Sequence, residues 1–132
     1  MILLDTHALV WLRLGSDRLG PKARRLIDEH WQSGQVYVSS ISFWEVAMLE
    51  GKGRLKLSQD IGAWYEEVLE QGLEEIPLSG RIGIRAAGLA NLPADPADRI
   101  IVATALDGYQ LVTADREILR WTSPLNRFDA GT

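Results

Sequence analysis

The chain has 132 residues, of which 46% are hydrophobic, which is enough apolar material for a globular domain with a full core. It contains no cysteine, so disulfides, thiolate metal sites and cysteine nucleophiles are excluded. The formal net charge of −4 argues against a broad basic surface for nucleic acid. It does not exclude a nuclease, because active-site acids would contribute to that charge and a bound metal would offset them.

The chain shows no sign of membrane insertion or export. No apolar run approaches the length of a membrane span, and the first residues lack the charged start and small-residue cleavage site of a signal peptide. It also has no internal repeat, low-complexity run or linker. We therefore expect a cytoplasmic protein in which residues 1–132 form a single domain.

The first strand is predicted at Ile2–Leu4, directly before Asp5 and a helical pattern over residues 8–12. A short continuous apolar run is typical of a strand that is buried on both faces, as in a parallel sheet. Such a strand carries the residue that follows it to the carboxyl edge of the sheet, where ligands of open α/β sheets bind. Asp5 is therefore predicted to lie at an active-site edge.

The rest of the chain alternates between helical and strand patterns. Helices are predicted at residues 22–32, 43–51, 60–71, 82–92, 96–107 and 116–121. Strands are predicted at residues 36–38, 73–77, 110–113 and 127–128. The proline and the paired acids in the second of these place it at an edge or a strand end. This alternation predicts a three-layer α/β/α sandwich with a mainly parallel central sheet.

Four acidic residues lie at or near predicted helix starts, namely Asp5, Glu45, Asp98 and Asp115. Each position also has a purely structural explanation, because side chains in the first turn satisfy free N–H groups and acids there gain about 0.3–1 kcal/mol from the helix dipole. Asp5 or Thr6 could cap the first helix, and Asp115 could cap the short helix after it. Ser42–Glu45 has the spacing of a capping box, and Asp95–Asp98 that of a cap followed by Pro and an acid.

Two features favour a functional role for these acids. Glu45 has apolar neighbours on both sides, where an ionised carboxylate is costly unless it is paired or bound to metal. Asp5 and Asp115 both follow apolar strands, so the fold would bring them to one edge, where helices carrying Glu45 and Asp98 in their first turns also start. Converging carboxylates repel each other unless a cation is present. Oxygen ligands without a His or Cys cluster indicate Mg²⁺ or Mn²⁺ rather than Zn²⁺.

Four segments of the chain resemble the sequence motifs of a known family. They are Leu3–His7, Ser42–Glu45, Asp95–Ala105 and Leu111–Asp115. In this order and spacing the chain resembles a PIN domain over essentially its full length, and more narrowly the VapC-type toxins of bacterial toxin–antitoxin pairs. The resemblance implies an α/β/α fold and an Mg²⁺- or Mn²⁺-dependent endoribonuclease that acts on RNA. It also implies a homodimer and a VapB-type antitoxin that inserts a segment near the active site, giving a toxin–antitoxin hetero-oligomer.

The resemblance implies roles for individual residues, position by position. The metal-site acids would be Asp5, Glu45, Asp98 and Asp115, and the supporting residues would be Thr113, Thr6 and Asp95. Asp5 and Asp98 would bind the principal ion directly, while Glu45 and Asp115 would hold it through water or hold a second ion. A metal-activated water would then cut the phosphodiester bond, leaving a 5′-phosphate and a 3′-hydroxyl. Asp95 has no firm role in the pattern and could be a further acid of the site or only a helix cap.

Several other residues have two explanations at this stage. His7 could contact substrate, although a hydrogen-bonded helix histidine is the preferred interpretation, and Arg99 could pair with an acid or face solvent. The basic residues Lys52, Arg54 and Lys56 could hold RNA phosphates or form a solvated turn. The tryptophans at 11, 44 and 64 are expected in the core or an interface rather than as base-stacking platforms. An antitoxin groove is expected on the apolar surface formed by Trp44, Ala47, Met48 and Trp64.

Three other functions remain open from the sequence. A phosphohydrolase could use Asp5 as its nucleophile, but such enzymes have a second Asp two residues later, where this chain has His7. A PIN-like binding module could have lost its chemistry, although all four acids are present. A flavodoxin-like receiver or nucleotide binder lacks support because Gly51-Lys52-Gly53 follows a predicted helix rather than a strand.

Overall fold

The computed structural model describes all of residues 1–132 and contains one five-stranded, fully parallel sheet. The strand order is β3-β2-β1-β4-β5. The strands are β1 (Ile2–Leu4), β2 (Val36–Ser39), β3 (Glu74–Ile76), β4 (Gln110–Thr113) and β5 (Arg127–Asp129). The predicted edge position of β3 is confirmed, and the first strand of the chain lies at the centre of the sheet.

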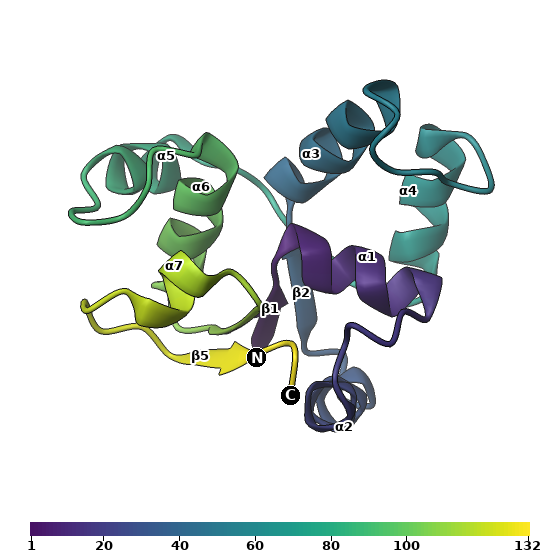
Figure 1. Cartoon of the computed structure of the whole chain (residues 1–132), viewed down its shortest axis with the longest axis horizontal. Helices are drawn as coiled ribbons and strands as arrows, with labels where there is room; N and C mark the ends of the chain where they lie inside the picture. The colour runs from purple at the N-terminus through teal and green to yellow at the C-terminus, as the bar shows by residue number, and fades with distance from the viewer.

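Helices cover both faces of this sheet, as the alternating sequence pattern predicted. They are α1 (Thr6–Leu14), α2 (Pro21–Trp31), α3 (Ser40–Gly51), α4 (Ile61–Glu70), α5 (Gly80–Ala87), α6 (Pro96–Ala105) and α7 (Arg116–Arg120). Figure 1 shows α5, α6 and α7 on one side of β1 and β2, and α1, α2 and α4 on the other. The predicted three-layer α/β/α sandwich is therefore confirmed.

The central strand contributes to both halves of the core because its residues point alternately to the two faces of the sheet. Ile2 and Leu4 pack in one cluster with apolar residues of α1, α2, α3 and α4. Leu3 packs in a second cluster with residues of α6, β4 and α7. All three side chains are fully buried, which explains why the strand reads as an uninterrupted apolar run.

The parallel register brings the carboxyl ends of three strands level. Leu4 is paired with Val38 on one side and with Val112 on the other. The next residues along each strand, Asp5, Ser39 and Thr113, therefore reach the same edge of the sheet. A backbone hydrogen bond of 3.1 Å from Asp5 N to Val112 O continues the ladder one residue past β1.

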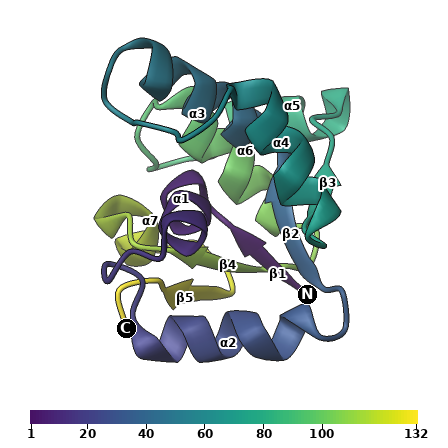
Figure 2. The same cartoon turned by 90° about the vertical axis from the view of Figure 1, so that its right-hand side faces the viewer.

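The C-terminal residues pack against the start of α2. The N–H of Gly20 donates to Ala130 O at 2.9 Å, and that of Lys22 donates to Thr132 O at 2.8 Å. A Cβ at position 20 would lie 2.2 Å from the carbonyl carbon of Thr132, so this approach requires glycine. Figure 2 shows the C-terminus beside the end at which α2 begins. No helix in the structure combines the length and the apolar character that a membrane crossing would need.

The largest differences from the predicted helix boundaries are at the start of α3 and at the end of α5. Helix α3 begins at Ser40 rather than at residue 43, and Ser39 is its N-cap, with its hydroxyl accepting from Ile41 N. The predicted capping box of Ser42 and Glu45 is therefore wrong, and Glu45 is the sixth residue of α3 rather than part of its first turn. Helix α5 ends at Ala87 instead of residue 92, because the chain turns away at Gly88.

Candidate active site

Asp5 lies almost completely buried at the carboxyl end of β1, with 5% of its surface exposed. One carboxylate oxygen, Oδ1, accepts a hydrogen bond from Ala8 N at 2.8 Å, so Asp5 is the N-cap of α1, as one of the structural explanations predicted. The other oxygen, Oδ2, accepts a hydrogen bond from the Thr113 hydroxyl. The capping interaction therefore uses only Oδ1, and Oδ2 lies at the carboxyl edge of the sheet, next to the end of β4.

Thr113 links Asp5 to Asp115. Its hydroxyl is fully buried at the end of β4, donates to Asp5 and accepts from Asp115 N at 3.1 Å. The Asp115 carboxylate in turn caps α7, accepting from Glu117 N at 2.9 Å and Ile118 N at 3.2 Å. Asp5 and Asp115 line a cleft of about 210 Å³ together with His7, Trp11 and Ala114, which we call the acid cleft.

Asp98 and Asp95 lie at the start of α6. The Asp95 side chain caps the helix by accepting from Asp98 N at 3.1 Å, so this predicted cap is confirmed. Asp98 is the third residue of α6 and is half-buried. Figure 1 shows the start of α6 facing α3, the helix that carries Glu45, across the end of the sheet.

The four predicted acids lie close enough to influence one another electrostatically. Burial raises the pKa of Asp98 to about 7, helped by the negative charges of Asp95, Asp115, Glu45 and Asp5. Burial also raises the pKa of Asp5, and Asp115 adds to the rise, while the hydrogen bonds from Thr113 and Ala8 and the nearby His7 oppose it. No lysine or arginine forms a salt bridge with any of these acids. The site therefore holds negative charge that the chain does not neutralise.

The donor set suits a hard divalent cation, although no closed metal cage is preformed. No three acidic or histidine side chains lie together in positions that could hold one ion. Mg²⁺ usually keeps several of its waters and binds through one or two carboxylates, so an open arrangement of this kind fits it. The repulsion between Asp98 and the neighbouring acids also favours a bound cation, because a cation would relieve this repulsion.

Comparison with known protein families gives this site a context. The family model of the PIN domain matches residues 2–122, a span that includes every acid described above. The chain belongs to the PIN-domain family.

Individual relatives support the same assignment. Ribonuclease VapC22 of Mycobacterium tuberculosis is 33% identical over 119 residues, which cover 89% of this PIN domain and 88% of the relative. A toxin–antitoxin complex from Klebsiella pneumoniae contains a chain with a TM-score of 0.68 and 21% identity, covering 98% of both chains. VapBC2 from Rickettsia felis, bound to a DNA fragment from their promoter, matches with a TM-score of 0.68 and 19% identity over 98% of this chain and 100% of that one. At identities of 21% and 19%, these two structures support the fold alone.

Ser42 of this PIN domain forms a contact with α1 instead of the predicted capping box. It accepts a hydrogen bond of 3.0 Å from the Thr6 hydroxyl, and both side chains are buried. The bond joins the first residue of α1, which follows Asp5, to α3, the helix that carries Glu45. Glu45 itself is half-buried and has no ion-pair partner.

Arg99 neither pairs with an acid nor faces solvent, so both sequence interpretations of it are wrong. Its guanidinium donates to five backbone carbonyls, those of Ala86, Ala87, Leu89, Leu92 and Pro93. Two of these carbonyls belong to the last turn of α5, whose C-terminal oxygens have no partners within the helix. Arg99 therefore ties the end of α5 and the following loop to the start of α6, next to Asp98.

The structure separates the aromatic residues that the sequence had grouped. Trp64 is buried, with 5% exposure, whereas Trp44 is 54% exposed. Trp64 therefore cannot form the proposed antitoxin groove with Trp44, because its side chain belongs to the core. His7 is exposed and its ring forms no hydrogen bond, so the preferred interpretation as a hydrogen-bonded helix histidine is wrong. Its ring instead lies 6.2 Å from that of Trp11, and both line the acid cleft.

Proposed function

We propose that this PIN domain is an Mg²⁺- or Mn²⁺-dependent endoribonuclease that acts in the cytoplasm as the toxin of a toxin–antitoxin pair. The observation that carries the proposal is the group of four acids at the carboxyl edge of the sheet, whose mutual repulsion helps to raise the pKa of Asp98 to about 7. The similarity to Ribonuclease VapC22 supports RNA as the substrate class. The fold shared with chains of toxin–antitoxin complexes supports an antitoxin partner.

The residues would divide the work as follows. Asp5 and Asp98 would hold the principal ion directly, and Glu45 and Asp115 would hold it through water or hold a second ion. When bound, the metal would supply a water of lowered pKa and stabilise charge on the phosphate. Thr113 favours the ionised form of Asp5 through its hydrogen bond, and Asp95 fixes the backbone of Asp98 by capping α6. Hydrolysis would leave a 5′-phosphate and a 3′-hydroxyl.

The partners follow from the same proposal. A VapB-type antitoxin would inhibit the enzyme by inserting a segment near the acids, in a hetero-oligomer built on a homodimer of this chain. Size-exclusion chromatography with light scattering, on the chain alone and with the co-expressed product of a neighbouring small gene, tests both statements. A monomer in each case would contradict them.

The decisive experiment sequences the 5′ ends of RNAs cut after induced expression of the chain, with the Asp98→Asn variant as control. We expect new 5′-phosphate ends at defined positions, absent from the variant. The purified protein should cut the same RNA with Mg²⁺ or Mn²⁺ and stop when EDTA is added. Cleavage that is equal in the Asp98→Asn variant would overturn the proposal.

The alternative phosphohydrolase is less compatible with the surroundings of Asp5. His7 lies two residues after Asp5, where such phosphohydrolases have a second Asp. Mass spectrometry after incubation with a phosphate ester tests this alternative, and a phosphorylated Asp5 would revive it. A binding module without chemistry would be indicated by calorimetry in which the protein ignores Mn²⁺.

A further inference from the structure

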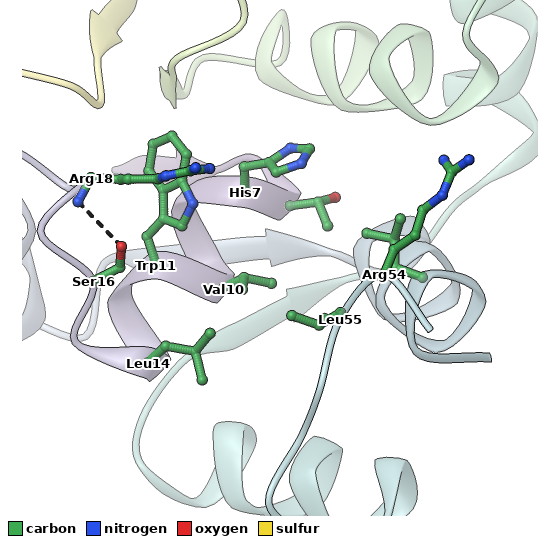
Figure 3. A pocket seen from close by; sticks show the side chains of 10 residues that line it. His7, Val10, Trp11, Leu14, Ser16, Arg18, Arg54 and Leu55 are labelled. Carbon is green, nitrogen blue, oxygen red and sulfur yellow. Dashed lines mark hydrogen bonds between the residues drawn. The ribbon is translucent and has the colours of Figure 1, made fainter. Parts of the chain in front are cut away.

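A second cleft runs along α1 beside the acid cleft. It has a volume of about 490 Å³, within the ~300–1,000 Å³ of typical ligand sites. One wall is formed by α1, with Val10, Trp11 and Leu14, and the other by the end of α3 and the loop after it, with Arg54 and Leu55. We call it the α1 cleft, and Figure 3 shows the side chains that line it.

The α1 cleft and the acid cleft share two side chains. His7 and Trp11 line both of them, so the two clefts meet along the exposed face of α1. The acid cleft contains Asp5 and Asp115. A polymer with one phosphate at these acids would therefore have its neighbouring units directed along α1.

Two unpaired guanidinium groups line the α1 cleft. Neither Arg18 nor Arg54 takes part in a salt bridge, and both are exposed. Figure 3 shows Arg18 at one end, beside Trp11, and Arg54 at the other, with His7 between them. By contrast, Arg85 is paired with Asp107, and Arg99 is saturated by carbonyls. The two free cations bring positive charge to an open cleft in a chain of net charge −4.

The rest of the lining suits a flat, partly apolar group. The Trp11 ring is half-buried against the main core, which holds it in place, and the His7 ring lies 6.2 Å away at 56°. The cleft floor is apolar, with Val10 and Leu55 among its residues. Aromatic rings beside guanidinium groups are the combination with which proteins hold single-stranded nucleic acid, by stacking bases and pairing with phosphates.

We propose that the α1 cleft binds the nucleotides of single-stranded RNA next to the phosphate that is cut, with a base against Trp11 and His7 and phosphates at Arg54 and Arg18. The proposal rests on the proposed ribonuclease function. Charge decides the occupant, because the phosphates of RNA complement two free guanidinium groups, whereas an apolar protein segment would leave them unpaired. It gives Arg54 the phosphate-binding role that the sequence had left open.

The test measures binding of a short fluorescein-labelled single-stranded RNA to the full chain by anisotropy, in the inactive Asp98→Asn background. We expect Arg54→Ala to weaken binding and to lower the slope of log K against log salt concentration by about 0.7, the value of one lost phosphate contact. We expect Trp11→Leu to weaken binding roughly tenfold at an unchanged salt slope, and Trp11→Phe to restore most of it. A change in salt slope separates a phosphate contact from a loss of folding.

Matched controls lie outside the cleft. Arg25 on α2 is an exposed arginine with no salt bridge, and Trp31 is a half-buried tryptophan packed against the same core. Arg25→Ala and Trp31→Leu should bind RNA like the parent. If the cleft variants match these controls, the proposal is overturned. It is also overturned if they bind RNA normally but lose a co-expressed antitoxin, since the cleft would then hold protein.

A second measurement separates this proposal from the function on which it rests. With an otherwise unchanged enzyme and Mn²⁺, Arg54→Ala and Trp11→Leu should raise KM for RNA cleavage about tenfold and leave kcat nearly unchanged. RNA that is cut with an unchanged KM would overturn the α1 cleft proposal alone. RNA that the parent enzyme does not cut at all would overturn the ribonuclease function.

Discussion

Thr113 and Asp5 are 108 positions apart in the chain, and the hydroxyl of Thr113 donates to Oδ2 of Asp5 in the buried part of the site. The bond exists because β1 and β4 are neighbours in register, which sets their carboxyl ends side by side. It supports the ionised form of a carboxylate that burial would otherwise drive toward its protonated form. The bond thus opposes the rise in the pKa of Asp5 that burial causes, and favours the form that can bind a cation.

Replacing this hydroxyl tests its importance. We expect Thr113→Val to raise the pKa of Asp5 further, since the bond that lowers it is lost, and to reduce Mn²⁺ affinity and cleavage about 10–100-fold. Calorimetry and kcat/KM measure the two effects. Thr113→Ser keeps the hydroxyl and should retain most of both, so a serine variant as weak as the valine variant would contradict the prediction.

The raised pKa of Asp98 predicts how stability depends on pH. The pKa is near 3.8 in the unfolded chain and about 7 in the fold, so the folded state holds the extra proton between these values and loses stability as the pH rises through them. Asp98→Asn should therefore stabilise the metal-free protein by about 1–2 kcal/mol at pH 8, a value reduced for partial exposure, and by almost nothing below pH 4. Urea unfolding in EDTA measures this, and a variant less stable than the parent at pH 8 would contradict it.

The raised pKa of Asp98 also predicts how metal binding depends on pH. An ion held by Asp98 must displace its proton, so Mn²⁺ affinity should rise about tenfold between pH 6 and pH 8 and level off above that. Calorimetry in buffers of different ionisation enthalpy should detect the released proton at pH 6. Asp28→Asn, on the exposed face of α2, should behave like the parent. An affinity independent of pH would remove Asp98 from the metal site.

The cluster of carbonyls around Arg99 predicts a large effect of a conservative change. Lysine has no planar fork and cannot reach five carbonyls at once, so Arg99→Lys should lower the free energy of unfolding by about 2–3 kcal/mol. Arg25→Lys on α2, where no ion pair is lost, should leave it unchanged. Urea denaturation compares the two, and equal stabilities would show that the carbonyl contacts contribute little.

Glu45 offers a test in which function and stability separate. Its carboxylate is half-buried, has no ion-pair partner and lies close enough to Asp98 to raise that residue's pKa. Glu45→Gln should therefore keep or slightly increase stability while lowering kcat of RNA cleavage more than about tenfold. Glu50→Gln, also half-buried on α3, serves as the matched control and should cleave normally. Normal cleavage by Glu45→Gln would exclude Glu45 from the site.

Sequence alone determined the features that depend on local pattern. A buried strand followed by Asp5, the alternation of strands and helices, and the caps at Asp95 and Asp115 all follow from neighbouring residues, because apolar periodicity and free N–H groups act over a few positions. These local patterns were sufficient to predict the parallel sheet and the edge at which the acids gather.

Tertiary structure decided what depends on residues far apart in the chain. The five carbonyls of Arg99 and the contact of Thr6 with Ser42 have no local signal, since these partners come together only when the layers pack. The α1 cleft is of the same kind, because Trp11 on α1 and Arg54 in the loop after α3 line it from opposite walls. Local chemistry placed Asp5, Asp98 and Asp115 near the ends of their elements, whereas long-range packing brought Glu45, inside α3, close to them.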